Sequence, residues 1–165
     1  MNGDPGSEPI RITDHPAAVE AATRIAADAR RGLWIRSLDL EGWLFDHPDF
    51  LAALRGFATS ARDVQVQVLL HDAAAPQAAH AKLLTLAQRL PSVFQFREVD
   101  DPVYREERVA LVANDAGGYY VRTQGDRVEG VAAFDSRGRV RQLQQRFDEI
   151  WERSRPVTEY RALGI

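Results

Sequence analysis

Four polar residues stand where two buried strands are predicted to end. Arg36 and Asp39 accompany the first long apolar stretch of the chain, and His71 and Asp72 directly follow the second. Ligands of α/β sheets bind beyond the carboxyl ends of parallel strands, which makes these side chains candidates for a binding site. His71 with Asp39 suits an acid–base pair or part of a metal site. Capping of a helix or a turn explains Asp72 and Asp39 equally well.

A second set of candidates follows in the last third of the chain. Arg105, Arg108 and Arg122, with Tyr119 and Tyr120, could line a groove for phosphate, because guanidinium groups bind phosphate through several donors and tyrosine stacks on bases. The alternative is that these side chains form a solvent-exposed face of a hairpin without a ligand. Four acidic neighbours, Asp100, Asp101, Glu106 and Glu107, weaken the attraction of phosphate to these arginines. The ligand-binding candidates are therefore Arg36, Asp39, His71, Arg105, Arg108, Tyr120 and Arg122.

Two short patterns imitate catalytic motifs. His80 and the only lysine, Lys82, form H-x-K, but the following leucines have helical spacing, which predicts a half-buried, hydrogen-bonded histidine. Arg127, Gly130 and Ala132 match the R-x-x-G-x-A pattern with which GNAT-type acetyltransferases bind the pyrophosphate of acetyl-CoA. That chemistry needs a helix N-terminus directly after the glycine, whereas residues 131–134 look like a strand. An acyl-CoA-dependent acyltransferase is kept as an alternative.

The elements that must position these residues follow from hydrophobic periodicity. We expect strands at 10–12, 33–40, 64–70, 93–99, 108–114, 119–123 and 128–134, and helices at about 16–31, 46–57, 76–90 and 136–154. Early strands alternate with helices, which favours parallel pairing, and late strands are joined by tight turns, which favours hairpins. The prediction is an α/β fold with a mixed parallel/antiparallel sheet flanked by helices. It forms a single domain over 10–155, between a disordered segment (1–9) and a tail (156–165).

This order of elements, closed by a helix that contains Phe147-Asp148-Glu149-Ile150-Trp151, resembles one half of the phospholipase D fold. The resemblance implies an H-x-K-x4-D motif, in which His attacks phosphorus and Lys binds the phosphate oxygens. Aligning its Asp with Asp115 places Arg108 at the His position and Ala110 at the Lys position. Neither residue can serve as the nucleophile, so the resemblance implies the fold without the reaction. Active relatives combine two halves, and we therefore expect a homodimer through the former active-site face.

The closing helix, with its sequence RFDEIWERS, is also similar to that of an uncharacterised proteobacterial domain that is often joined to acetyltransferase modules. This second resemblance implies an accessory domain that associates with an acetyltransferase. It implies no catalytic residue.

Composition excludes several classes of function. The 165 residues include no cysteine, which rules out disulfides and thiolate chemistry. A net charge of -3 gives no basic field, so we do not expect a nucleic-acid partner. Residues 1–12 lack the apolar core of a signal peptide, and no apolar run approaches the roughly 20 residues of a membrane span.

The sequence therefore predicts a cytoplasmic protein that is catalytically silent and acts as a binding or assembly module. We expect no cofactor and no resident metal. A homodimer or a protein partner is expected, and a phosphate or nucleic-acid binder is kept as the other alternative.

Overall fold

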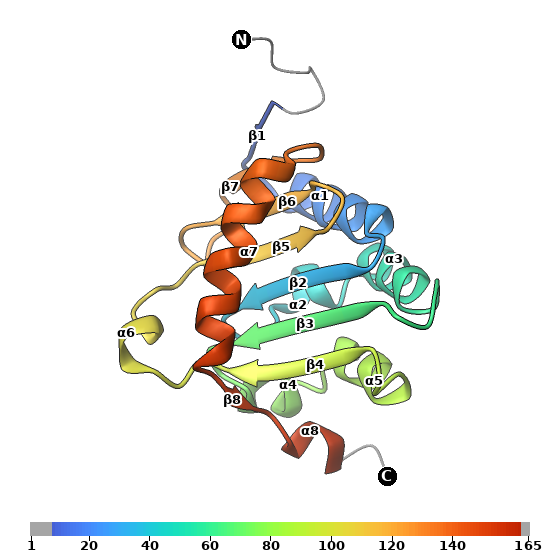
Figure 1. The fold of residues 1–165 in the computed structure, drawn as a ribbon, viewed down its shortest axis with the longest axis vertical. Coiled ribbons are helices and arrows are strands. Elements are labelled where there is room, and N and C mark those ends of the chain that lie inside the picture. Colours follow the sequence, from blue (N-terminus) through green and yellow to red (C-terminus); the bar gives the residue numbers. More distant parts are fainter. Residues whose placement is uncertain (1–7, 163–165) are drawn as a thin grey trace.

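One sheet of eight strands runs through the centre of the protein (Figure 1). The computed structural model describes residues 8–162. In chain order the strands are β1 (Ile10–Ile12), β2 (Gly32–Ser37), β3 (Gln65–Leu70), β4 (Phe94–Glu98), β5 (Ala110–Asn114), β6 (Tyr119–Arg122), β7 (Gly130–Ala133) and β8 (Arg155–Pro156). They are ordered β1-β7-β6-β5-β2-β3-β4-β8 across the sheet.

The sheet is mixed, as the sequence predicts. β2, β3 and β4 are parallel neighbours, and β5 lies antiparallel to β2. β6, β7 and β1 extend the sheet by antiparallel pairing, and β8 closes the opposite edge antiparallel to β4. Because β5 runs against β2, the residues that precede β5 lie at the same edge as the carboxyl ends of β2 and β3. This edge carries the candidate site.

Helices cover both faces of the sheet unequally. The helices are α1 (His15–Asp28), α2 (Gly42–Phe45), α3 (Pro48–Ala58), α4 (Ala74–Ala78), α5 (Lys82–Arg89), α6 (Pro102–Arg105), α7 (Arg137–Glu152) and α8 (Glu159–Ala162). Figure 1 shows α7 crossing the front of the sheet, with α1, α3 and α5 behind it. The result is a three-layer α/β domain.

The two faces of the sheet bury separate cores. On the face covered by α1, α3 and α5, apolar side chains such as Ile35, Leu54 and Val68 form the larger cluster. On the other face, Phe147 and Trp151 of α7 pack with Trp34, Leu111 and other apolar residues. The alternation of side chains along each strand divides the residues between the two cores.

The stripe predicted for the last helix is confirmed. Val140, Phe147, Ile150 and Trp151 are buried, and Leu143 packs against the same cluster. Their spacing of three and four residues places them on one face of α7.

The single helix predicted at 76–90 is wrong. Two short helices, α4 and α5, replace it, and His80 lies between them in the left-handed region with φ of 52°. His80 is exposed, not half-buried as the sequence analysis expects.

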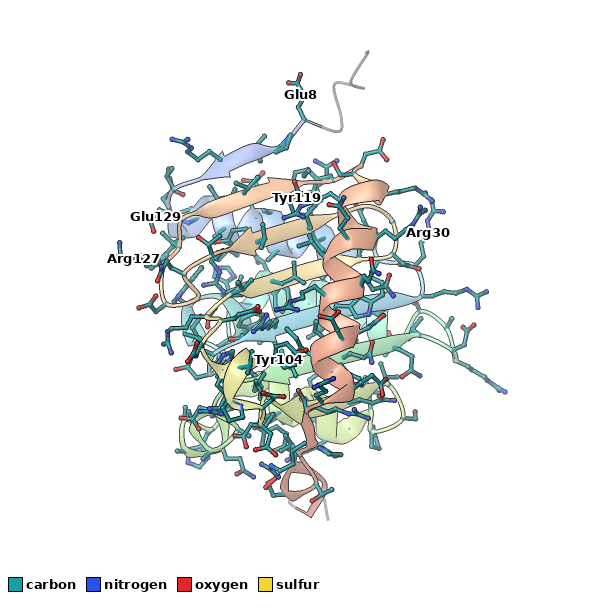
Figure 2. The ribbon with its side chains drawn as sticks, turned by 60° about the vertical axis from the view of Figure 1, so that its left-hand side comes forward. Glu8, Arg30, Tyr104, Tyr119, Arg127 and Glu129 are labelled. Atoms are coloured by element: carbon teal, nitrogen blue, oxygen red, sulfur yellow. The ribbon has the colours of Figure 1, made fainter. Side chains whose placement is uncertain are left out.

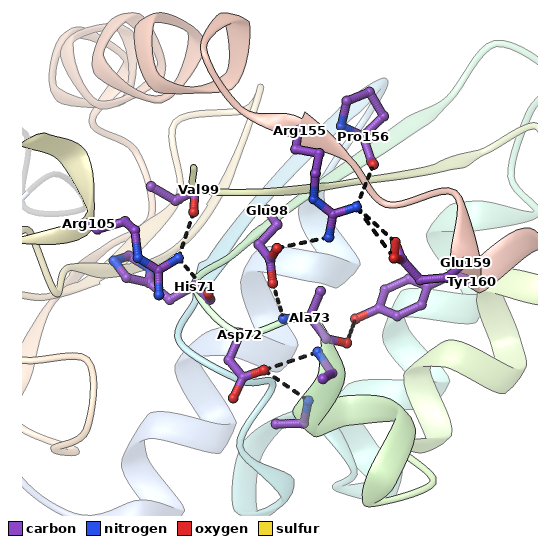
Figure 3. Close-up of polar contacts among 12 residues, drawn as sticks. His71, Asp72, Ala73, Glu98, Val99, Arg105, Arg155, Pro156, Glu159 and Tyr160 are labelled. Carbon is purple, nitrogen blue, oxygen red and sulfur yellow. Dashed lines mark hydrogen bonds and ion pairs between the residues drawn. The ribbon is translucent and has the colours of Figure 1, made fainter. Parts of the chain in front are cut away.

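The chain from Arg155 to the end of the described residues is joined to the fold, although the sequence analysis treats residues 156–165 as a tail. Arg155 donates to Glu98 of β4 (2.8 Å), and the Tyr160 hydroxyl donates to the carbonyl of Ala73 (2.6 Å) (Figure 3). Val157 and Tyr160 are buried in the larger core. Most of the segment predicted to be disordered, residues 1–7, lies outside the described residues. Within residues 8–162, no helix is long and apolar enough to cross a membrane.

Candidate functional site

A hollow of about 460 Å³ opens at the carboxyl ends of β2 and β3. We call it the edge cleft. It is lined by Leu38, Asp39, Glu41, Trp43, His71, Asp72, Arg105, Arg108, Gly125 and Asp126. Its walls come from the loops after β2 and β3, from the α6–β5 connection and from the turn between β6 and β7.

Four of the seven predicted site residues meet in this cleft. Asp39 and His71 follow the ends of β2 and β3, and Arg105 and Arg108 come from the segment that leads into β5. The rule that ligands bind beyond the carboxyl ends of parallel strands brings the first two together, and the antiparallel course of β5 adds the others.

His71 contributes a neutral, enclosed imidazole. It is 6% exposed, and its Nε2 donates to the backbone carbonyl of Glu107 at 2.7 Å. Burial lowers the pKa of the imidazole, and the positive charges of Arg36, Arg105 and Arg108 lower it further. Because Nε2 holds the proton, Nδ1 carries a lone pair, and this atom is buried without a hydrogen-bond partner.

The pKa of the Asp39 carboxyl is shifted in the opposite direction, upward. Burial raises the pKa of its carboxyl, and the nearby carboxylates of Glu41 and Asp72 raise it further, against the influence of Arg108 and Arg122. Asp72 is held at the start of the next turn, where its carboxylate accepts from the backbone nitrogens of Ala74 and Ala75. The helix-capping interpretation of Asp72 is therefore confirmed.

The two cleft arginines differ in how they are held. Arg105 Nη1 donates to the carbonyls of Val99 (2.8 Å) and His71 (3.1 Å), which fixes the guanidinium against the backbone (Figure 3). The Arg108 side chain is exposed and makes no hydrogen bond or ion pair within residues 8–162, although the Arg108 carbonyl accepts from the backbone nitrogen of Gly125 (2.6 Å). Arg108 is thus the cleft cation that is available to a ligand or partner.

Tyr120 and Arg122 lie behind the cleft wall and not in it. The Arg122 guanidinium is buried, forms an ion pair with Glu41, and donates to the carbonyls of Gly125 and Arg127. Burial raises the pKa of Tyr120 to about 12, and its hydroxyl donates to the carbonyl of Val128. We conclude that these two side chains hold the β6–β7 turn in place.

Arg36 lies on the other face of the sheet. It alternates with Ile35, so it points with Trp34 toward α7 instead of toward the edge cleft. Its Nη1 donates to the Glu107 carboxylate (3.2 Å) and its Nη2 to the Glu107 carbonyl (3.3 Å). A second groove, between α7, strand β6 and the segment before β5, contains Arg36, and Arg108 borders both hollows.

Glu107 is the residue that sequence reasoning missed. Its carboxylate pairs with Arg36 and Arg146, and its carbonyl accepts from His71, so it joins the two hollows. Burial would raise the pKa of the Glu107 carboxyl, but hydrogen bonds from Arg146 and Arg36 outweigh burial and lower it. Both partners are more than 35 residues away in the chain, and no local pattern indicates such pairs.

Comparison with known proteins assigns the chain to a family and a fold. Residues 14–163 match the domain family described as "Domain of unknown function (DUF7931)". The chain belongs to this family. No protein with a curated function is significantly similar to it in sequence.

Solved structures show that the DUF7931 domain has a phospholipase D-like fold. Nuc, a phospholipase D family member from Salmonella typhimurium, is 13% identical with a TM-score of 0.60, over 90% of this chain and 98% of Nuc. NucT from Helicobacter pylori is 12% identical with a TM-score of 0.59, over 90% and 99% of the two chains. TrmBL2, an archaeal chromatin protein whose structure shows a novel mode of DNA binding, is 13% identical with a TM-score of 0.62. That match covers 94% of this chain and 56% of TrmBL2, so the DUF7931 chain spans little more than half of it.

The three residues that the resemblance aligns with H-x-K-x4-D lie in different surroundings. Arg108 stands at the rim of the edge cleft, whereas Ala110 is 0% exposed inside the sheet. Asp115 lies at the far end of β5, where its carboxylate accepts from the backbone nitrogens of Arg30 (2.9 Å) and Arg31 (3.0 Å). Asp115 therefore fixes the loop before β2.

The two motif imitations do not form sites in this DUF7931 domain. Gly130 begins strand β7, so no helix follows it directly, and the acetyl-CoA pattern is a chance match. A Cβ at Gly130 would collide with the carbonyl of Val121, and this close approach of strands explains the glycine. His80 and Lys82 lie at the α4–α5 junction, outside both the edge cleft and the α7 side of the sheet.

The chemistry open to the edge cleft is recognition by charge and hydrogen bonding. Among residues 8–162, no group of three or more His, Cys, Asp or Glu side chains is arranged to hold a metal ion. The exposed charged groups of the cleft are the guanidinium groups of Arg105 and Arg108 and the carboxylates of Asp39, Asp72 and Asp126, and of the two guanidinium groups only that of Arg108 has no hydrogen bond within the described chain.

Proposed function

We propose that this protein is a catalytically silent module of the phospholipase D-like fold that assembles with a second copy of itself through the face around the edge cleft. The observation that carries the proposal is the state of His71. A phosphodiesterase of this fold needs an imidazole nitrogen that can reach phosphorus. In the edge cleft Nε2 is bonded to a carbonyl and Nδ1 is buried, so neither nitrogen is presented to a substrate.

The motif positions support the same proposal. Arg108 carries no lone pair for attack at neutral pH, because a guanidinium stays protonated. The buried Ala110 offers no cation to a phosphate oxygen. In this proposal, the edge cleft offers a phosphodiester no accessible imidazole and no lysine.

The surface around the cleft favours a protein partner. Val103 of α6 is 70% exposed, more than the other large exposed apolar residues of the described chain, Ile10 and Val131. α6 lies at the carboxyl edge of β2 and β3 (Figure 1); Arg105 is its last residue, and Arg108 follows three residues later. Exposed apolar side chains rimmed by charges are typical of protein-binding surfaces.

The charges favour a second copy as that partner. In a twofold interface each surface meets its own copy, so a surface must complement itself. The cleft combines Arg105 and Arg108 with the carboxylates of Asp39, Asp72 and Asp126. In the proposed twofold dimer, Arg108 of one protomer meets these carboxylates of the other.

Sedimentation velocity on the full chain at about 10 μM tests the assembly. We expect a dimer for the wild type and at least a tenfold weaker association for Val103→Asp, because the substitution places a charge in an apolar contact. Val131→Asp, an exposed valine far along the chain on β7, is the matched control and should dimerise like the wild type. A wild-type monomer, or equal effects of both variants, would contradict the proposal.

Hydrolysis of bis(p-nitrophenyl) phosphate tests the silent site. We expect no turnover above buffer for the wild type. Turnover that disappears in His71→Ala would show that His71 acts as a nucleophile and would refute this part of the proposal, whatever the oligomeric state.

A further inference from the structure

The hollow on the opposite face of the sheet has a different character from the edge cleft. It measures about 600 Å³ and lies between α7, strand β6 and the segment 106–109 that precedes β5. We call it the α7 groove. Its polar lining includes Arg36, Thr123, Gln124, Arg139, Gln142 and Arg146.

Arg36 lies in the floor of this groove and is unusual for its burial. Its side chain is 4% exposed, and its Nε is buried without a hydrogen-bond partner. Burial lowers the pKa of the guanidinium, but arginine remains charged in proteins. A buried, fully charged donor with an unused N–H is costly unless an acceptor can be supplied to it.

Positive charge exceeds negative charge around Arg36. The groove contains four guanidinium groups, including that of Arg108, and two carboxylates, those of Glu106 and Glu107. The Glu107 carboxylate forms ion pairs with both Arg36 and Arg146. Arg146 forms a second ion pair with Glu149, three residues further along α7. Within residues 8–162, the Arg139 guanidinium hydrogen-bonds only to a neutral group, the side-chain oxygen of Gln142, at 3.2 Å. Even with Glu149 included, the groove retains an excess of one positive charge.

The sequence of α7 gives a second reason to expect an anion. From Arg137 to Arg146 the helix carries four arginines and no acidic residue, with Asp and Glu confined to its last turns. The helix dipole favours the reverse distribution, so helix stability does not explain these arginines. Arg139, Gln142 and Arg146 are spaced by three and four residues and face the groove together.

Figure 2 shows that α7 runs across the sheet with Tyr104 beside its lower half. The Arg146 guanidinium lies over the Tyr104 ring, 5.1 Å from its centroid. This contact orients Arg146 along the groove, so that it and Arg36 approach the same carboxylate from two sides.

We propose that the α7 groove binds a small phosphorylated molecule, whose phosphoryl oxygens take the place of the Glu107 carboxylate on Arg36 and Arg146. A phosphoryl group suits several guanidinium donors at once, and the volume suits a ligand of about nucleotide size. Thr123, Gln124 and Gln142 supply neutral hydrogen-bonding groups for the rest of the molecule. An extended polyanion fits less well, because the chain is net acidic and the groove ends against Glu106.

Replacement of Glu107 gives this proposal a distinctive signature. Glu107→Gln removes the competing charge, so it should tighten binding of a phosphorylated ligand even though it weakens a native ion pair. Arg139→Ala removes a groove cation that forms no ion pair within residues 8–162, and should weaken binding about tenfold or more, which corresponds to one charge-assisted hydrogen bond. Arg141→Ala is the matched control, since Arg141 is an exposed α7 arginine outside the groove.

Calorimetric titration of the full-length protein with pyrophosphate, with AMP and with a dT20 oligonucleotide, at 50 and 300 mM NaCl, tests the proposal. We expect pyrophosphate or AMP to bind, more weakly at the higher salt, with Arg141→Ala unchanged within twofold. Circular dichroism verifies the fold of each variant. No binding of either small probe, equal losses in Arg139→Ala and Arg141→Ala, or binding of dT20 alone would overturn it. Val103→Asp should bind as the wild type does, so the groove is tested separately from self-association.

Discussion

The side chain at position 110 stands where the sequence analysis aligns the lysine of H-x-K-x4-D. Ala110 is 0% exposed and pairs across the sheet with Arg122 of β6, in a region without space or solvent for an ammonium group. Burial of a charged amine without a partner is strongly unfavourable. The packing at this residue therefore leaves no place on β5 for a phosphate-binding lysine.

We therefore expect Ala110→Lys to lower the free energy of unfolding by about 3 kcal/mol or more. Urea denaturation measures the change. Arg108→His, at the exposed neighbouring motif position, is the control and should change stability by about 0.5 kcal/mol at most. A lysine tolerated at position 110 without loss of stability would show that the strand can accommodate the phosphate-binding amine after all.

His71 gives a pH dependence with a defined sign. Its pKa is lowered in the folded state, chiefly by burial, so between the folded and unfolded values the unfolded chain binds more protons. Stability therefore rises with pH in that range and is lost as the pH falls below the unfolded value. We expect the melting temperature to fall from pH 7.5 to pH 5.5, and to fall less in His71→Gln.

The exposed His80 provides the control for that experiment, as His80→Gln. Measurements stay above pH 5, because the lowered pKa values of Glu98 and Glu107 make those carboxylates contribute to acid unfolding at lower pH. An identical pH profile for wild type and His71→Gln would show that the imidazole is not desolvated as the structure indicates.

The predicted site residues show what a sequence can and cannot place. Asp39 and His71 could be brought together, because strand order and the strand-end rule follow from local patterns. Arg36 could not be assigned to its face, since a buried strand such as β2 is apolar on both sides and its alternation is hidden. Arg122 looks the same in sequence whether it meets a ligand or, as here, Glu41.

At the scale of elements, close packing of β7 against β6 replaces the helix that an acetyl-CoA site would need. Gly130→Ala should lower the free energy of unfolding by about 1–3 kcal/mol, because the new methyl group meets the Val121 carbonyl and lies 2.9 Å from the Tyr120 ring. Chemical denaturation measures this.

Gly56→Ala is the matched control for that substitution. Gly56 lies within α3, and a Cβ there meets nothing within 4 Å, so the substitution should stabilise the protein by about 0.5–1 kcal/mol. Equal effects of the two substitutions would mean that the approach of β7 to β6 is looser than the structure shows.

The elements that the sequence predicts are those with long periodic patterns. β2, β3, β4 and α7 carry extended apolar runs or stripes, and each is found within a few residues of its predicted ends. α2 and α6 have four residues each, too few for a periodic pattern, and β8 exists only through its pairing with β4. The break between α4 and α5 depends on His80 adopting a positive φ, for which histidine gives no strong signal.

At the scale of the whole molecule, one sheet is shared by two cores that do not touch each other. Leu54 of α3 belongs to the larger core and Phe147 of α7 to the smaller, and both are almost fully buried. Every strand from β2 to β6 contributes side chains to one or both cores. Loss of either helical layer therefore exposes one side of the same strands, and we expect the layers to unfold together.

Leu54→Ala and Phe147→Ala test this coupling. Each should lower the free energy of unfolding by about 2–5 kcal/mol, since each leaves a cavity in a buried cluster. The double variant should show the sum within about 0.5 kcal/mol, because the two sites lie on opposite faces and share no contact. Urea unfolding followed in parallel by tryptophan fluorescence and circular dichroism should give one transition for every variant. Two separate transitions in Phe147→Ala would mean that α7 and its core unfold first, which would release the α7 groove while the rest of the sheet stays folded.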